Sequence, residues 1–303
     1  MDSVDVRLPS LTKSFGMPDT DLRDRTFLIT GANSGIGRAL AEALAARQAR
    51  LILAARSAER MAPVLDLIRQ RHPGAAATFL PLNLADFSSV RAAAEQVLGN
   101  SGVLDVLVNN AGVAGTRGLS RDGYHLTYAV NHLGPFLLTA LLLPKLRAAP
   151  SARIVNVSSV AHFRAKPIDW QLLAPNPPSP RGTFQDCANS KLMNVLHAKE
   201  LARRLAGTGV TTYALHPGGV ATNIWRALPG PLQWVIKLFL ISNEEGARTP
   251  LYCATAPELA GVTGRYYDKE REVRCKRMAD DLALAAELWD RSARATGMVS
   301  DQP

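Results

Sequence analysis

Three glycines near the start of the chain have the spacing of a phosphate-binding turn. The stretch 26–37 reads T-F-L-I-T-G-A-N-S-G-I-G, and its apolar run Phe27 to Thr30 is typical of a buried parallel strand. Alanine and leucine then recur at helical spacing, so the glycines lie between a strand and a helix. The first glycine permits a tight turn, the second lets a phosphate approach the backbone, and the third lets the helix pack on its strand. The helix N-terminus therefore faces an anion. The residues expected to surround that anion are Gly31, Asn33, Ser34, Gly35, Ile36 and Gly37.

Two arginines stand where a dinucleotide-binding fold distinguishes its cofactors. A second predicted strand, Leu51 to Ala55, is followed by Arg56. An Asp or Glu there would bind the ribose 2′-hydroxyl of NAD, whereas an arginine accommodates the 2′-phosphate of NADP. Arg38 directly follows the last glycine and is a second guanidinium within reach of that phosphate. We therefore expect NADP(H).

Alternating strands and helices would position this turn. Further strands are predicted at 77–82, 104–108, 153–157, 210–215 and 264–267, with alanine- and leucine-rich helices between them. This alternation is typical of the α/β class, in a single-domain Rossmann-type doubly wound parallel sheet flanked by helices. The 303 residues suffice for one such domain. We predict an N-terminal arm over 1–25, a dinucleotide-binding domain over 26–303, and a terminal, solvent-facing helix over 279–296.

The composition excludes several classes of protein. The net charge is +9, but basic residues lie among acidic ones, so we expect no nucleic-acid binding. The three cysteines, at 187, 253 and 275, are too few and too scattered for a disulfide framework or a metal site. They indicate a reducing compartment. Since the N-terminus contains no apolar run, we expect a cytoplasmic protein without a signal peptide or an integral membrane segment.

Several further motifs follow the glycine turn in a fixed order. They are N-N-A-G at 109–112, V-N-H-L-G-P-F at 130–136, V-N-V-S-S-V-A-H at 155–162 and S-K-L-M-N-V-L at 190–196. Together with T-G-A-N-S-G-I-G, they resemble the short-chain dehydrogenase/reductase family, especially its retinol dehydrogenase-like branch. The resemblance covers about residues 24 to 270.

The resemblance implies additional cofactor-binding residues. Asn83 stands where the family usually has an Asp that accepts a hydrogen bond from the adenine amino group, and an Asn carbonyl can still accept it. In H-P-G-G-V-A-T, the family's P-G-x-x-x-T pattern binds the nicotinamide carboxamide. The implied cofactor residues are Asn83, Leu84, Asn110, Ala111, Gly112, Lys191, Pro217, Gly218, Val220 and Thr222.

The resemblance also implies a substrate site. The second serine of N-x-S-S, Ser159, would hydrogen-bond a substrate carbonyl, and Ser158 would serve the turn. Asn131 would disturb its helix and hold a water in a proton relay. The apolar, aromatic segment 224–241 stands where the family has its mobile substrate lid, which would suit a hydrophobic small molecule, and a core or dimer helix is the alternative. A homo-oligomer is compatible with the resemblance, because the family often pairs helices in dimers and tetramers.

The sequence departs from the family at its catalytic Tyr-x-x-x-Lys pair. Four residues before Lys191 stands Cys187, and no tyrosine occurs between Ser159 and Lys191. The family lysine binds the nicotinamide ribose and lowers the pKa of the tyrosine. At i and i+4, Lys191 could likewise lower the pKa of the Cys187 thiol. A thiol is shorter than a phenol, however, and losing a positioned general acid typically costs about 100- to 10,000-fold in rate.

Three functions remain open for such a site. The chain could be an NADP-dependent oxidoreductase of altered or reduced activity, in which water or substrate geometry replaces the phenol. It could be a non-redox enzyme that uses Cys187 as a thiolate nucleophile or acid/base. It could also be a catalytically silent NADP(H)-binding protein, a natural or engineered variant in which Cys187 merely packs.

Overall fold

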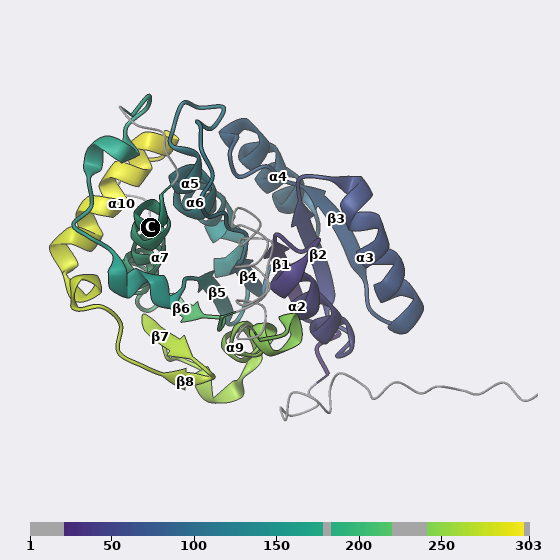
Figure 1. Cartoon of the computed structure of the whole chain (residues 1–303). Helices are drawn as coiled ribbons and strands as arrows, with labels where there is room; N and C mark the ends of the chain where they lie inside the picture. Colours follow the sequence, from purple (N-terminus) through teal and green to yellow (C-terminus); the bar gives the residue numbers. More distant parts are fainter. Residues whose placement is uncertain (1–20, 178–182, 220–240, 300–303) are drawn as a thin grey trace, which may run out of the picture.

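A computed structural model describes residues 21–177, 183–219 and 241–299, and these residues form an eight-stranded sheet (Figure 1). The strand order is β3-β2-β1-β4-β5-β6-β7-β8, and all neighbours pair in parallel except β7 and β8. The expected α/β class and doubly wound sheet are confirmed, whereas the short antiparallel β8 was not predicted. The strands are β1 (Thr26–Thr30), β2 (Arg50–Ala55), β3 (Ala77–Pro81), β4 (Val106–Asn109), β5 (Ala152–Val157), β6 (Val210–His216), β7 (Arg265–Asp268) and β8 (Arg271–Glu272).

Helices cover both faces of the sheet. One face packs against α2 (Gly35–Ala45), α3 (Ala58–Arg71) and α9 (Asn243–Thr255). The other packs against α4 (Phe87–Gly99), α6 (Gly134–Arg147) and α7 (Phe184–Arg204), with α10 (Leu282–Thr296) outside them. The shorter segments are α5 (Leu126–Tyr128), the π-helical η1 (Ala129–Leu133), and the 3-10 helices η2 (Val160–Arg164), η3 (Trp170–Leu173), η5 (Pro257–Leu259) and η6 (Arg277–Asp280).

The alternation of side chains in the strands explains the two apolar layers. In β1, Phe27 and Ile29 join the core beneath α2 and α9, whereas Leu28 joins the core beneath α6 and α7. In β5, Ile154 and Val155 divide in the same way. Both faces of each strand are apolar because both are covered, as parallel strands require.

The C-terminal helix, predicted to face solvent, is buried along one side. The indole of Trp289 in α10 is 3% exposed, and its ring centroid lies 4.9 Å from that of Phe136 in α6 and 5.9 Å from that of His197 in α7. The Arg204 guanidinium covers the indole at 4.5 Å. The other side of α10 does face solvent, where Leu282 and Arg294 are exposed, so the prediction holds for one face of the helix only.

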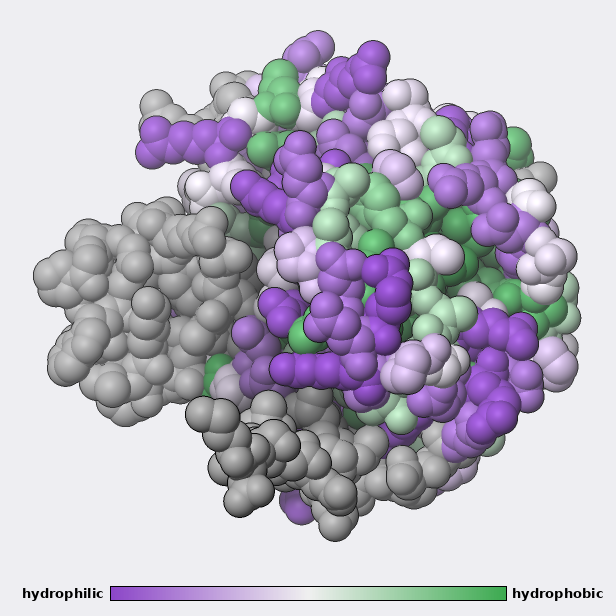
Figure 2. Space-filling model, turned by 90° about the vertical axis from the view of Figure 1, so that its right-hand side faces the viewer, coloured by the Kyte–Doolittle hydropathy of each residue, from purple (hydrophilic) through white to green (hydrophobic). Residues whose placement is uncertain are grey.

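Within the described residues, one helical stretch, Leu126–Arg147, is long and apolar enough to cross a membrane by length and composition alone. Inside the protein, 78% of its apolar window is buried, as is typical of a core helix. On the molecular face shown in Figure 2, hydrophilic residues surround a smaller hydrophobic area. The absence of an integral membrane segment stays a prediction.

Candidate functional site

The turn between β1 and α2 has the backbone geometry that three glycines permit. Gly31 and Gly35 have φ values of +68° and +56°, in the left-handed region that favours glycine. A Cβ on Gly37 would lie 2.5 Å from the carbonyl oxygen of Gly31 and 2.6 Å from Nδ2 of Asn110. The turn therefore closes tightly and presents backbone rather than side chains.

The N-terminus of α2 is available to an anion. Within the described residues, the side chain of its N-cap, Ser34, makes no capping hydrogen bond, whereas the N-cap side chains of α3, α4, α7, α9 and α10 all accept backbone N–H groups. The first-turn N–H groups of α2, from Gly35 to Gly37, remain for a bound group. This donor set, at a helix N-terminus and without side chains in the way, fits the pyrophosphate of a dinucleotide.

The N-N-A-G motif supports this turn from the next strand. Nδ2 of Asn110 donates to the carbonyl oxygen of Thr30 at 2.8 Å, and the backbone N–H groups of Asn110 and Ala111 donate to Oγ1 of Thr30 at 3.0 Å. Gly112 follows on the surface. The side chain of Asn110 thus holds the start of the glycine turn, while Ala111 and Gly112 lie at the carboxyl end of β4.

The predicted adenine side of the site contains two arginines in different surroundings. Arg56 is exposed directly after β2. Arg38 is held along α2 by a hydrogen bond from its Nε to Oε1 of Glu42 at 2.7 Å. Oδ1 of Asn83 accepts the N–H of Ala85 at 3.2 Å, which leaves its second lone pair for another donor. The side chain of Leu84 is buried.

Asn131 lies in an irregular part of its helix. It lies in η1, where the α-helix widens to a π-helix. Its Oδ1 accepts the N–H of Val113 at 2.8 Å, and its Nδ2 donates to the carbonyl oxygen of Val113 and to Oγ of Ser190, both at 2.9 Å. Asn131 therefore joins the loop after β4 to α7.

The two serines after β5 have different surroundings. Oγ of Ser158 is buried and donates to the carbonyl oxygen of Lys191 at 2.7 Å, so this side chain joins the end of β5 to α7 rather than closing the turn. Ser159 is half-buried, and its Oγ accepts the N–H of Ala161 at 3.2 Å, so its hydroxyl proton can be donated to a ligand. The ring of His162 holds this turn, because Nε2 accepts the N–H of Lys276 and Nδ1 contacts the Ser159 carbonyl oxygen at 2.7 Å.

The amine of Lys191 lies between the N-N-A-G motif and the turn that carries Ser158 and Ser159. Its Nζ is buried and donates to the carbonyl oxygen of Val157, at the end of β5, at 3.0 Å. A Cβ on Gly112 would lie 3.3 Å from the same Nζ and 3.3 Å from Oδ1 of Asn131. The amine therefore lies where the ends of β4 and β5 and the start of α7 converge.

Cys187 lies one helical turn before Lys191 and is half-buried. Burial raises the pKa of its thiol, Lys191 opposes this and Asp186 adds to it, so that the pKa is higher than usual. Lys191 thus acts on the thiol in the expected direction, but desolvation outweighs the nearby amine. Burial also lowers the pKa of Lys191.

The last predicted cofactor motif is only partly described. Pro217 and Gly218 follow β6, and a Cβ on Gly218 would lie 2.3 Å from Cδ1 of Ile241. Val220, Thr222 and all of the predicted lid except Ile241 lie outside the described residues.

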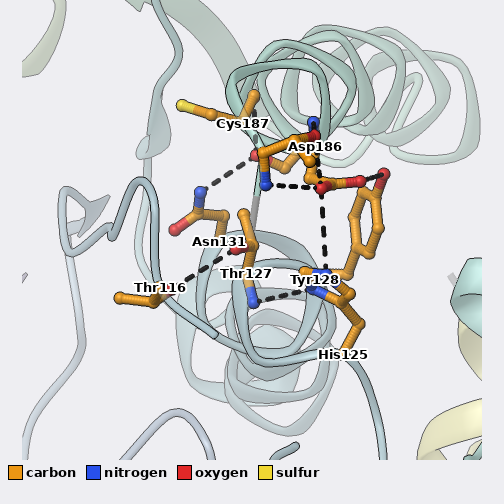
Figure 3. A network of polar contacts seen from close by, with 9 residues as sticks. Thr116, His125, Thr127, Tyr128, Asn131, Asp186 and Cys187 are labelled. Carbon is orange, nitrogen blue, oxygen red and sulfur yellow. Dashed lines mark hydrogen bonds and ion pairs between the residues drawn. The ribbon is translucent and has the colours of Figure 1, made fainter. Parts of the chain in front are cut away.

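Sequence reasoning missed three buried polar residues beside the site. Figure 3 shows Asp186 facing Tyr128, with the sulfur of Cys187 directed away from both. The Tyr128 hydroxyl donates to Oδ1 of Asp186 at 3.0 Å, and Ser190 receives the hydrogen bond from Asn131. The available signals were the spacing T-x-x-D before the helix, which is a capping box, and Tyr128 one helical turn before Asn131.

Residues 25–169 match the family model described as short chain dehydrogenase. Dehydrogenase/reductase SDR family member 13 of Bos taurus is 41% identical to the chain over 285 residues, which span 91% of this chain and 74% of the relative. Human retinol dehydrogenase 12 is 39% identical over 297 residues, which span 96% of this chain and 93% of the relative.

Solved structures are similar over most of the chain. An uncharacterised protein from Mycobacterium paratuberculosis has a TM-score of 0.72 and 32% identity, covering 94% of this chain and 96% of its own. An NADPH-bound short chain oxidoreductase from Pseudomonas aeruginosa, described as containing an atypical catalytic center, has a TM-score of 0.66 and 26% identity. That similarity covers 82% of this chain and 96% of the other.

Proposed function

Because the chain belongs to the short-chain dehydrogenase/reductase family, we propose that it is an NADP-dependent oxidoreductase that acts on a hydrophobic carbonyl or alcohol. We further propose that Cys187 occupies the position of the family's catalytic tyrosine, so that proton transfer is altered or reduced.

The position of Lys191 is the observation that carries this proposal. Its Nζ contacts the end of β5 next to the serine turn and lies beside Gly112 of the N-N-A-G motif. An amine there can reach a ribose that lies over the carboxyl ends of the strands. It also remains next to the substrate position at Ser159. A dinucleotide on the glycine turn would extend over this same edge, since ligands of such sheets bind at the carboxyl ends of the strands.

Charge at the end of β2 supports NADP rather than NAD. Arg56 is exposed there and no carboxylate takes its sequence position, so a 2′-phosphate would meet a cation. Arg38 uses Nε for Glu42, and its guanidinium retains two amino groups that can bind phosphate. One similar solved structure is described as NADPH-bound.

When bound, the nicotinamide supplies a hydride to a carbonyl carbon or takes one from an alcohol. The chain's own residues then orient the substrate and move the proton. Ser159 donates a hydrogen bond to the substrate oxygen, Lys191 holds the ribose, and Asn131 keeps the Val113 loop and α7 together around them.

The proton has to travel farther than in a site that contains a tyrosine. The Cys187 sulfur lies one bond beyond Cβ, whereas a phenolic oxygen lies across a six-membered ring, so a water must bridge the thiol and the substrate oxygen. With its pKa raised by burial, the thiol is protonated at neutral pH and is a weak proton donor rather than a nucleophile. A protonated thiol disfavours the alternative of a non-redox enzyme that uses Cys187 as a thiolate nucleophile.

Apolar side chains next to the site support a hydrophobic substrate. Val160 follows Ser159 directly, Phe163 lies on the same short helix, and Phe184 begins the helix that carries Cys187. They are 46%, 46% and 58% exposed, respectively. Apolar groups left open beside a polar site are typical of a binding surface.

Location and assembly are further parts of the proposal. The three cysteines are free, which supports a reducing, cytoplasmic environment. If copies of the chain associate, they would use a surface other than the face of α7 against α10, because Trp289 already packs there.

A panel of hydrophobic aldehydes and ketones tests the proposal directly. We expect slow, substrate-dependent oxidation of NADPH, followed by nicotinamide absorbance, and none with NADH at the same concentration. Ser159→Ala should remove the rate without weakening NADPH binding. If a substrate is converted while nicotinamide absorbance stays constant and Cys187→Ser abolishes the conversion, the protein is a non-redox enzyme. Tight NADPH binding without turnover of any panel member would instead identify a silent binding protein.

A further inference from the structure

Two hydrogen bonds tie the α5–η1 segment to α7 on either side of Cys187. One runs from the Tyr128 hydroxyl to Oδ1 of Asp186 at 3.0 Å, and the other from Nδ2 of Asn131 to Oγ of Ser190 at 2.9 Å. Cys187 follows Asp186 directly and precedes Ser190 by three residues (Figure 3). The position of the thiol along and around the helix is therefore held from both sides.

Asp186 is only 6% exposed, and both oxygens of its carboxylate accept hydrogen bonds. Its Oδ2 accepts the N–H of Thr183 at 2.7 Å and the Thr183 hydroxyl at 2.6 Å, while its own N–H donates to Oγ1 of Thr183 at 3.1 Å. His125 adds a third neighbour, because its Nε2 lies 3.9 Å from Oδ2. Since Nδ1 of His125 accepts the N–H of Thr127, a neutral His125 has its proton on Nε2, facing the carboxylate.

The Tyr128 hydroxyl is not needed to fill the core. Its side chain is 1% exposed, and a phenylalanine would occupy nearly the same volume. A buried hydroxyl and a buried carboxylate are each costly unless they are paired, so the tyrosine is best explained by its hydrogen bond. Burial, together with the nearby Asp186, raises the pKa of Tyr128, so the hydroxyl remains a donor throughout the neutral and mildly alkaline range.

We propose that Tyr128 and Asp186 are a positioning pair, which fixes the first turn of α7 and thereby holds the Cys187 thiol and the Lys191 amine against the segment that carries Asn131. The proposal rests on the proposed function in one respect, namely that Cys187 and Lys191 belong to the site. Neither Tyr128 nor Asp186 contacts a reacting group in it. Their effect passes through the position of Cys187.

Alkylation of Cys187 by iodoacetamide tests this proposal without requiring turnover. Tyr128→Phe removes only the hydroxyl, and Tyr124→Phe is its matched control. Tyr124 is also buried, lies four residues earlier, and donates to the carbonyl oxygen of Ala295 at the end of α10 rather than to α7. Peptide mass spectrometry follows Cys187, with the half-buried Cys275 as an internal reference in the same molecules.

We expect Tyr128→Phe to raise the alkylation rate of Cys187 about fivefold, the factor that corresponds to roughly 1 kcal/mol for one lost hydrogen bond. Cys275 should react at its original rate in both variants, and Tyr124→Phe should leave both thiols unchanged. If the two variants accelerate Cys187 equally, or if Cys187 and Cys275 accelerate together, the hydroxyl has only a general structural role and the proposal is overturned.

A second variant, on α7 itself, tests how Asp186 is held in case Tyr128→Phe does not fold. Thr183→Ala removes the hydroxyl that Asp186 accepts and should also accelerate Cys187 selectively. If it does not, the proposal fails. Where NADPH turnover is measurable, Tyr128→Phe should lower kcat severalfold with little change in KM for NADPH. A chain without turnover would contradict the proposed function while leaving the alkylation result intact.

Discussion

The N-termini of α2 and α7 are built in opposite ways. The α2 terminus follows a glycine turn, and within the described part of the chain its N-cap side chain, Ser34, makes no capping hydrogen bond. The α7 terminus is closed by a complete capping box between Thr183 and Asp186, to which Tyr128 adds a further hydrogen bond. One helix end leaves its N–H groups for a ligand, and the other satisfies them internally and holds its side chains in place.

This difference separates two ways of making a site. At α2 the backbone would bind the ligand, so the sequence must supply small residues in the turn. A residue larger than glycine at position 37 would be too close to Gly31 and Asn110. At α7, in the proposed function, the chemistry depends on which side chain is presented. A single position, Cys187, can therefore change the reaction without disturbing the sheet or the glycine turn.

Restoring a phenol at α7 should have the largest effect. We expect Cys187→Tyr to raise NADPH-dependent reduction of a hydrophobic aldehyde by about 100- to 10,000-fold, because it restores a general acid within reach of the substrate. Cys187→Ser is the control, since its hydroxyl is as short as the thiol and should not raise the rate. A Cys187→Tyr protein that binds NADPH normally but gains no activity would contradict the assigned role of this position.

At α2 the sharpest substitution is Gly37→Ala. The added Cβ would lie 2.5 Å from the Gly31 carbonyl oxygen, so the turn must open, and we expect NADPH affinity to fall roughly 10- to 100-fold in calorimetric titrations. Gly99→Ala, at the end of α4 with no atom within 4 Å of its Cβ, should leave the affinity unchanged. Equal NADPH affinities in the two variants would show that the glycine turn does not bind the cofactor.

Arg56→Ala should weaken NADPH binding about tenfold and leave NADH binding unchanged, because only the 2′-phosphate would lose a charged partner. The exposed Arg69, paired with Asp66 near the other end of α3, provides the control. Calorimetric dissociation constants for both dinucleotides measure the effect. A parallel loss for NADPH and NADH would show that Arg56 does not distinguish them.

The smallest expected effect concerns the pH dependence of the thiol. The pKa of Cys187 is raised from the usual 9.0, mainly by burial, so its alkylation rate should still be increasing above pH 9. Lys191→Met removes the charge that opposes this shift and should move the midpoint to higher pH, with an about two- to threefold slower reaction at pH 8. Alkylation profiles of the two proteins, with Cys275 as reference, measure the shift. A midpoint that moves to lower pH would be the contrary result.

Much of the fold could be predicted because its signals are local. The apolar runs around Phe27 and Val155 and the glycine spacing before α2 depend on neighbours in the sequence, and the predicted strands do form one sheet that is parallel except for β8. The packing of Trp289 could not be predicted, since it depends on α6 and α7, which are distant in the sequence.

The site was predicted less completely for the same reason. Glycines and the Lys191 motif are visible in the sequence, but the raised pKa of Cys187 results from burial in the folded protein. The partnership of Tyr128 with Asp186 joins residues 58 positions apart, and neither residue belongs to the motifs that carried the family resemblance. Sequence patterns thus identify the ligand-binding backbone more readily than the side chains that position the chemistry.

Calorimetric titration of the folded, unmodified chain with NADPH and with NADH tests the central claim most directly. The account predicts saturable binding of NADPH and at least about tenfold weaker binding of NADH. No binding heat with either dinucleotide at several temperatures, from protein whose circular dichroism shows the folded state, would contradict it.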